Sequence, residues 1–302
     1  MLFDNTDGKK INNLNRRYII KNIKPLKSFI NYNEKTFLKH DKKLVYFNMS
    51  LKSFNNELHY AVRAGDKKIG KEYFDPKFTS QVFVGTISNK LENHREINVS
   101  FNDIKNGRLG LEDPRIFEWK KELYFSGDIP FNLIHKKQKN AFVNINTGSH
   151  KVFEDHKERT LSKNWMPYVE KNKLHFITDV FPTTLLDSKT KQVKTYNNNI
   201  PTKIFVSGGG RIVEIDGYKT AIVHGKIPGS FYWHSIAQWD KYWNLKISDP
   251  FYFNKMATEF SVGYEVHNNK VYFTYSENDD GVILCNLKLE DFLNSKIWSN
   301  DV

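Results

Sequence analysis

From residue 43 onward, apolar and polar positions alternate in a pattern that recurs five times along the chain. Each copy consists of a polar motif, a short apolar strand, a turn of Lys, Asn, Glu, Asp or Gly, and a second strand. The turns, such as Asn55-Asn56-Glu57 and Asp216-Gly217, are of the kind that closes β-hairpins. The second strands begin about 50 residues apart, at Leu58, Leu123, Leu174, Ala221 and Val271. A repeat of this length predicts an all-β fold, a five-bladed β-propeller.

The rest of the chain fits around this repeat. Two β-sandwiches are the alternative architecture, but they would not explain why one polar motif opens every copy. Residues 1–40 are polar and basic, and we interpret them as an N-terminal arm or outer strand that packs across the main body. Residues 41–302 are then a single propeller domain. Only residues 289–293 show apolar residues at helical spacing, which predicts a short C-terminal helix.

The propeller places the polar motifs relative to one another. If each motif begins the innermost strand of its blade, all five converge at one mouth of the central channel. Cations outnumber carboxylates in the pocket expected there, as a site that uses an anion requires. Its predicted members are Asn48, Arg63, Asp113, Arg115, Lys163, Asn164, Arg211, His224, Tyr232 and Asp279.

The most concentrated motif is Glu112-Asp113-Pro114-Arg115. Pro114 fixes its own φ and disfavours helical geometry in the residue before it, so we expect Asp113 to be extended. Arg115 is close enough in sequence to pair with either carboxylate. Two carboxylates beside one cation form a setting that separates pKa values, which acid–base chemistry needs. The alternative is a turn before a strand, tied by a weak surface ion pair.

Charge adds a preference for anionic partners. The chain has 46 Lys and Arg against 34 Asp and Glu, a net charge of +12, scattered along its length. This balance suits phosphate, nucleotide-sugars, nucleic acid or anionic membranes. Because no nucleic-acid-binding signature accompanies the charge, we expect a phosphate-bearing small molecule and not nucleic acid. Nucleic-acid binding through the basic surface stays open as a third candidate function.

Other classes of protein are disfavoured by what the sequence lacks. No apolar run approaches the ~20 residues of a membrane span. Residues 1–10 have no apolar signal core, so we predict a cytoplasmic protein without a transmembrane segment. The single cysteine, Cys285, supports neither a disulfide framework nor a cysteine metal site. His224 has no second His or acid at ligand spacing, so no metal and no cofactor are predicted.

The run Gly208-Gly209-Gly210 is not interpreted as a phosphate-binding loop. No Gly-Lys-Ser/Thr follows it, and the next element is predicted to be a strand and not a helix. We expect the run to allow close approach of the backbone at the channel.

Several of these segments resemble a known family. Gly110-Leu111-Glu112-Asp113-Pro114-Arg115-Ile116 resembles the hallmark of glycoside hydrolase family 130 (GH130), the five-bladed mannoside phosphorylases, and of the related β-1,2-mannosyltransferases. Lys163-Asn164-Trp165-Met166-Pro167 is similar to a Lys-Asn-Trp-x-Pro segment of many relatives. Asn48-Met49-Ser50 is similar to an early Asn-Pro-Ser. These segments carry the resemblance, which spans roughly residues 45–293.

Further matches follow in the family's order: Arg63 closes a strand, Arg211 lies where a basic residue is expected, Tyr232 follows His224-Gly225, and Tyr275–Asp279 resembles a closing Tyr-Gly-x-x-Asp. The departures are Met49 for Pro, the three glycines for a proline-rich run, and Ser276 for Gly.

The resemblance implies a carbohydrate-active enzyme with a mannoside-like substrate. It implies that Asp113 is the general acid, acting with inversion through a sugar hydroxyl, while Arg, Lys, His and Tyr side chains hold phosphate. Inorganic phosphate, a sugar 1-phosphate or a nucleotide-sugar would be a substrate. The predicted binding residues are Asn48, Arg63, Glu112, Arg115, Lys163, Asn164, Trp165, Arg211, His224, Tyr232 and Asp279.

Two of these assignments have structural alternatives, because Trp165 could pack in the core and Asp279 could cap a turn. Transfer or phosphorolysis is favoured over hydrolysis, since phosphate is already an anion and needs no second carboxylate as base. A glycoside hydrolase and a non-catalytic propeller that binds glycan or protein remain the alternatives.

Overall fold

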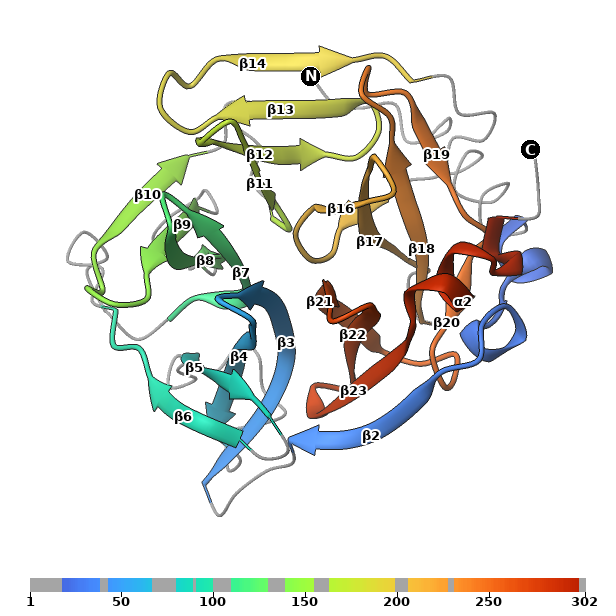
Figure 1. The fold of residues 1–302 in the computed structure, drawn as a ribbon, viewed down its shortest axis with the longest axis horizontal. Helices are drawn as coiled ribbons and strands as arrows, with labels where there is room; N and C mark the ends of the chain where they lie inside the picture. The colour runs from blue at the N-terminus through green and yellow to red at the C-terminus, as the bar shows by residue number, and fades with distance from the viewer. Residues whose placement is uncertain are drawn as a thin grey trace, which may run out of the picture.

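The computed structural model describes residues 18–38, 43–66, 80–88, 91–99, 110–129, 139–154, 163–198, 206–227 and 231–298. Their strands form five sheets that surround a common centre, so the fold is all-β and propeller-like (Figure 1). Four sheets have four strands each and one has seven. The prediction for residues 1–17 of the N-terminal arm lies outside the described residues.

Three of the four-stranded sheets follow one another along the chain. The first contains β3 (Leu44–Phe54), β4 (Glu57–Asp66), β5 (Gln81–Ile87) and β6 (Leu91–Glu96). The second contains β7 (Glu112–Trp119), β8 (Glu122–Ile129), β9 (Lys139–Asn144) and β10 (His150–Glu154). The third contains β11 (Met166–Glu170), β12 (Lys173–Asp179), β13 (Thr183–Asp187) and β14 (Val193–Tyr196).

The other two sheets include strands from the N-terminal part of the chain. The seven-stranded sheet contains β1 (Lys24–Pro25), β15 (Ser207–Gly208), β16 (Val213–Ile215), β17 (Tyr218–Lys226), β18 (Tyr232–Trp239), β19 (Leu245–Ile247) and β20 (Phe251–Tyr252). The last sheet contains β2 (Asn33–Leu38), β21 (Glu259–His267), β22 (Lys270–Glu277) and β23 (Asp280–Lys288).

All five predicted hairpins are confirmed by antiparallel pairing of their two strands. Each turn carries two successive residues with positive φ, which is the geometry of a type I′ turn. These pairs are Asn55-Asn56, Lys120-Lys121, Lys171-Asn172, Asp216-Gly217 and Asn268-Asn269. The polar turn residues therefore fix both the position and the register of each hairpin.

The inner strands are interrupted where the polar motifs lie. The register shifts between Phe47 and Ser50 in β3 and between Glu112 and Arg115 in β7. Inside these shifts Asn48 has φ 53° and Asp113 has φ 49°. The expectation that Pro114 would hold Asp113 extended was wrong, because the bulge requires a left-handed residue there. Asn and Asp accept that conformation more readily than most residues.

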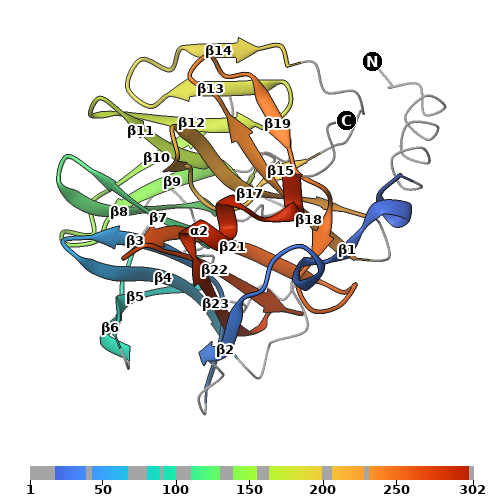
Figure 2. The same ribbon diagram turned by 45° about the vertical axis from the view of Figure 1, so that its right-hand side comes forward.

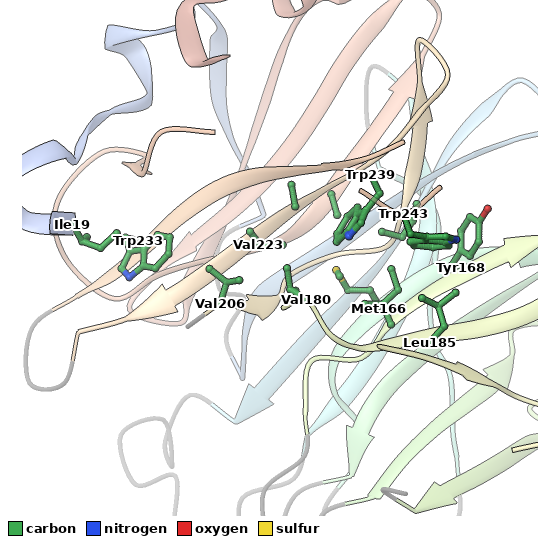
Figure 3. Close-up of a cluster of buried hydrophobic side chains, with 14 of the residues drawn as sticks. Ile19, Met166, Tyr168, Val180, Leu185, Val206, Val223, Trp233, Trp239 and Trp243 are labelled. Atoms are coloured by element: carbon green, nitrogen blue, oxygen red, sulfur yellow. The ribbon is translucent and has the colours of Figure 1, made fainter. Parts of the chain in front are cut away.

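Side chains between neighbouring sheets form the core. Figure 3 shows one such cluster, in which Met166 and Tyr168 of β11 lie near Trp239 of β18 and Trp243 at one end, and Trp233 of β18 lies beside Ile19 at the other. Trp239 also donates a hydrogen bond from Nε1 to Thr183 Oγ1 of β13, at 2.8 Å. The third sheet and the seven-stranded sheet are therefore locked together, which keeps their channel ends fixed.

The N-terminal segment packs on the outside of the ring (Figure 2). Residues 18–22 are helical, whereas the sequence predicted an extended arm. Beyond them, β1 pairs with β20, and β2 pairs with β23 as the outer strand of the last sheet. The predicted C-terminal helix is confirmed as α2 (Leu289–Leu293). No helix in the described part of the chain is long and apolar enough to cross a membrane.

Candidate active site

A cluster of charged side chains lies where the inner strands begin and the second strands end. The bulge residues Asn48 and Asp113 come from the inner strands. The second strands contribute at matching register positions, where Phe47 pairs with Arg63 and Glu112 pairs with Asp128. Asn48 and Arg63 of one copy of the repeat both contact Asp113 of the next, so residues from separate copies meet, as the propeller prediction required.

Asp113 is a buried carboxylate of this cluster. It is 6% exposed. Asn48 donates from Nδ2 to Asp113 Oδ1 at 2.7 Å, and Arg63 Nη1 lies 3.5 Å from the same oxygen. Burial raises the pKa of Asp113, but Arg63, Arg115, Lys163 and the Asn48 amide together hold that pKa below its usual value. Asp113 is therefore an anion whose Oδ2 has no hydrogen bond among the described residues.

Arg63 binds both acids of the motif. Its Nη2 lies 2.7 Å from Glu112 Oε1, and its Nε donates to Ser80 Oγ at 2.9 Å. Ser80 in turn donates to the carbonyl of Leu111 at 2.8 Å. Arg63 therefore binds both carboxylate side chains from the neighbouring sheet, whereas Arg115, which is close enough in sequence to pair with either, contacts the backbone carbonyl of Asp113.

Arg115 instead donates hydrogen bonds to acceptors on three different segments of the chain. It donates to the carbonyl of Gly209 at 2.6 Å, to the carbonyl of Asp113 at 2.8 Å and to Asn164 Oδ1 at 2.9 Å. At 1% exposure it is a buried cation. Its planar fork satisfies several acceptors at fixed angles, which a Lys could not do.

The three glycines allow the close approach that the sequence predicted. A Cβ at Gly209 would lie 2.5 Å from the Ile222 carbonyl oxygen, and a Cβ at Gly210 would lie 2.4 Å from that of Val262. Both gaps are shorter than any real Cβ contact. The glycines therefore let the Gly209 carbonyl come within reach of Arg115.

Asp128 is a further acid of the cluster. It is 0% exposed, and both of its carboxylate oxygens accept from the Asn164 backbone N–H, at 3.1 and 3.2 Å. Arg115 Nη1 lies 3.7 Å from Oδ2. Burial and the charge of Asp113 raise the pKa of Asp128 to about 7, against the opposing effects of Arg115, the Asn164 N–H and Lys163.

Lys163 and Tyr232 form the open side of the cluster, next to the buried ring of His224. Lys163 is exposed, and within the described part of the chain it has no ion-pair partner. Asp113, Asp128, Glu112 and Tyr232 raise its pKa against the lowering effect of burial. The rings of Tyr232 and His224 are 5.7 Å apart. Lys163 is thus a cation left available beside an anionic carboxylate.

His224 is neutral. Burial, Arg115 and Lys163 lower its pKa to about 3, and its Nδ1 has no hydrogen-bond partner among the described residues. On the adjacent strand His234 pairs with it in register. His234 is 0% exposed, and neither of its ring nitrogens has a described partner.

Two predicted site residues, Arg211 and Trp165, lie apart from this cluster. Arg211 donates to the carbonyls of Leu51 and Ile212 and to Glu265. Trp165 is 2% exposed and packs in a core cluster, 5.9 Å from the ring of Phe176, so its surroundings favour the core-packing alternative. Asp279 lies in the turn between β22 and β23 with φ 53°.

Arg211 lies toward the other end of the channel. It lines a cavity of about 920 Å³. The wall of that cavity consists of the far ends of inner strands and their hairpin turns, with Lys52, Glu118, Trp119, Tyr168 and Asn172 among the lining residues. In β7, Glu118 follows Asp113 by five positions, which is about 16 Å along an extended strand.

The sequence interpretation did not select Asp128 or Ser276. Ser276 accepts a hydrogen bond from the Asn48 backbone N–H at 2.8 Å. Both lie at the end of a second strand, paired with the residue before a bulge, as Arg63 does. Asp128 and Ser276 occupy the same position in their second strands as Arg63 does in its own, so the repeat pattern of the second strands was the signal for both.

No metal site is evident, because the described residues contain no group of three or more His, Cys, Asp or Glu that could hold an ion. The residues present are suited to hold an anion beside a carboxylate.

Comparison with known proteins gives a match in structure alone. No family model matches the sequence, and no curated protein matches it. A glycoside hydrolase of the GH130 family of mannoside phosphorylases, described as targeting β-1,2 mannosidic linkages in Candida mannan, superposes with a TM-score of 0.63 and 14% identity, over 89% of this chain and 97% of that one.

Two further structures superpose similarly. β-1,2-Mannobiose phosphorylase from Listeria innocua gives a TM-score of 0.61 at 11% identity, over 92% of this chain and 96% of that one. A GDP-Man-dependent mannosyltransferase from Leishmania mexicana gives 0.58 at 12% identity, over 85% and 89%. The resemblance to GH130 and mannosyltransferase structures that the motifs predicted is therefore confirmed at the level of the fold.

Proposed function

We propose that the protein is a carbohydrate-active enzyme that transfers a glycosyl group, with inversion, to or from a phosphorylated sugar or nucleotide-sugar. The observation that carries the proposal is the arrangement of Asp113 and Lys163. Asp113 is anchored through Oδ1, and Lys163 beside it is exposed without an ion pair among the described residues. One carboxylate oxygen and one ammonium group are left to meet a substrate.

The chemistry in the direction of transfer follows from these groups. Asp113 takes the proton from an acceptor hydroxyl, directly or through a sugar hydroxyl. The acceptor oxygen forms the new bond to the anomeric carbon from the face opposite the phosphate. The bond from that carbon to the phosphate oxygen breaks, and the phosphate leaves with the electron pair toward Lys163, His224 and Tyr232. In phosphorolysis the same steps run backwards, and Asp113 returns the proton.

Hydrolysis is less well supported. An inverting hydrolase needs a second carboxylate to activate water, roughly 6.5–9.5 Å from the acid. Glu112 is tied to Arg63 at 2.7 Å, and Asp128 is 0% exposed. The Glu112 carboxylate is thus already paired with a guanidinium, and the Asp128 carboxylate has no solvent contact, so neither is suited to activate a water molecule.

The compared structures bear on the substrate. They are described as a phosphorylase of β-1,2-mannobiose, a glycoside hydrolase acting on β-1,2 mannosidic linkages and a GDP-Man-dependent transferase. We therefore propose a mannoside-like substrate and further propose that the seven-stranded sheet is the fifth blade. A cytoplasmic location stays a prediction from the sequence.

The test is a ligand screen by thermal shift followed by turnover. Inorganic phosphate, mannose 1-phosphate and a panel of nucleotide-sugars are added to the wild type and to Asp113→Asn. Stabilisation by a nucleotide-sugar indicates a transferase, and stabilisation by phosphate and mannose 1-phosphate alone indicates a phosphorylase. Asp113→Asn should lower turnover by about 10³-fold or more while ligand binding and the fold persist.

Asp216→Asn is the matched control. Asp216 has φ 50° in a hairpin turn, close to the 49° of Asp113, but it lies outside the cluster, and its substitution should leave turnover unchanged. If Asp113→Asn keeps wild-type turnover, the catalytic assignment is wrong. If no ligand stabilises the wild type, a non-catalytic binding propeller becomes the better description. Steeply salt-dependent binding of nucleic acid would indicate the third candidate.

A further inference from the structure

Asp128 is a buried acid that the proposed reaction does not use. It lies at the end of β8, in register with Glu112, and its carboxylate is 0% exposed. Its carboxylate accepts the Asn164 N–H, and Arg115 Nη1 lies 3.7 Å from Oδ2. A buried charge with so few donors is costly unless a proton can neutralise it.

The charges of the cluster balance before any substrate arrives. Three carboxylates, Glu112, Asp113 and Asp128, face three cations, Arg63, Arg115 and Lys163. A phosphate group adds one to two negative charges on the Lys163 side. The site would then hold more negative charge than its cations balance, in a region where burial makes such an excess expensive.

We propose that Asp128 is a positioning residue that takes up a proton from solvent when a phosphate-bearing substrate binds beside Lys163. This inference rests on the proposed function. Protonation of Asp128 removes one negative charge, so that the positive charges of Arg115 and Lys163 offset that of the phosphate. Asp113 stays ionised and can accept the proton of the acceptor hydroxyl. When the phosphate product leaves, Asp128 returns its proton to solvent.

The surroundings of Asp128 support this role from each packed segment. Asp113 and Arg115 face it from β7, and Lys163 and the Asn164 N–H face it from the segment before β11. The pKa of Asp128, raised to about 7, places its titration near neutrality. An added anion repels the carboxylate and competes for the two cations, so the pKa rises further and a proton is bound.

Isothermal titration calorimetry tests the proposal. Inorganic phosphate and mannose 1-phosphate are titrated into the full chain at about pH 8, in two buffers of different ionisation enthalpy. The difference in heat gives the protons taken up per ligand bound. We expect roughly half to one proton for the wild type and nearly none for Asp128→Asn, which mimics the protonated acid and should still bind the ligand.

Glu259→Gln is the matched control. Glu259 is also 0% exposed with a pKa raised by burial, but it accepts the backbone N–H groups of Phe253, Asn254 and Lys255 outside the cluster. Its substitution should leave the proton uptake unchanged. Circular dichroism of both variants checks the fold. A second measurement follows the Asp128 carboxyl carbon by NMR, whose titration midpoint should move to higher pH when phosphate is added.

The outcomes separate the two proposals. Binding to the wild type without proton uptake, or with equal uptake in Asp128→Asn, overturns the role of Asp128 and leaves the proposed function in place. Failure of both ligands and of every nucleotide-sugar to bind overturns both. Proton uptake that disappears only in Asp128→Asn supports the role of Asp128.

Discussion

The two ends of the channel contain the same kinds of side chains in different states of pairing. At the far end Arg211 is bound to Glu265, and Lys52 lies 3.6 Å from Glu118. Glu265 also accepts the backbone N–H groups of Ser53 and Val266. Arg211 and Lys52 are thus each paired with an acid, and Glu265 has further donors.

At the near end the pairing is incomplete. Among the described residues, Oδ2 of Asp113 has no hydrogen bond and Lys163 has no ion pair. Nδ1 of His224 also has no hydrogen-bond partner among them. The inner strands are bulged here, with left-handed residues where side chains must turn toward the channel. Both ends contain arginines and acids, so these residue types do not identify the candidate active site. Unsatisfied groups on a strained backbone do.

The largest effect is expected from substitution of Arg115, which connects several segments at the near end. Arg115→Lys keeps the charge but cannot reach Gly209, Asp113 and Asn164 together. We expect the free energy of unfolding to fall by about 2–4 kcal/mol and turnover by about 10²-fold, since small displacements in a site have such costs. Urea unfolding and initial rates measure both.

Lys219→Arg is a control for that change, because Lys219 is a buried cation of β17 outside the cluster. If Arg115→Lys is as stable and as active as the wild type, the forked geometry of the guanidinium is not needed.

Acidification should weaken the near end through its histidines. His224 has a pKa of about 3, and burial, with a smaller effect of the neighbouring His224 ring, holds the pKa of His234 well below its usual range. The unfolded chain binds protons at both residues below about pH 6.5, whereas the folded chain does not. The free energy of unfolding therefore falls as the pH drops from about 6.5 toward 3.

His234→Phe should reduce that loss and raise the free energy of unfolding at neutral pH by about 1–3 kcal/mol, because two ring nitrogens no longer lie unpartnered among Phe251 and Phe253. Urea unfolding at several pH values measures the slope. His150→Gln, at an exposed position, should leave the slope as it is. An unchanged slope in His234→Phe would contradict this account.

The smallest effect is expected at the far end. The sequence predicts that Arg211 binds phosphate, whereas its contacts place it with Glu265. If those contacts define its role, Arg211→Gln combined with Glu265→Gln should leave turnover within about twofold and lower stability by about 1 kcal/mol. A tenfold rise in KM for the phosphate-bearing substrate would instead support the predicted role.

Local patterns predicted the architecture well. The paired turn residues, such as Asn268-Asn269, specify hairpins through their own backbone preferences and do not depend on the rest of the chain. The polar motifs marked the start of each inner strand, so Asn48, Asp113 and Asn164 were found from the sequence. Each of these predictions needed only short-range information.

What the sequence could not supply was register and pairing between sheets. Asp128 becomes part of the site only because it pairs with Glu112 across a bulge. Arg63 binds the carboxylates that lie next to Arg115 in the sequence, and Arg211 binds Glu265. The Arg63–Glu112 and Arg211–Glu265 contacts join residues 49 and 54 positions apart.

The pairing of β2 with β23 also has a consequence for how the molecule folds. These strands lie roughly 250 positions apart, and their ladder completes the last sheet. The chain-entropy cost of closing so long a loop exceeds that of a loop one tenth as long by only about 2 kcal/mol. Contacts this distant in sequence form slowly, however. The ring is therefore expected to assemble sheet by sheet and to close last, so that its final barrier is the search of one short strand for its partner.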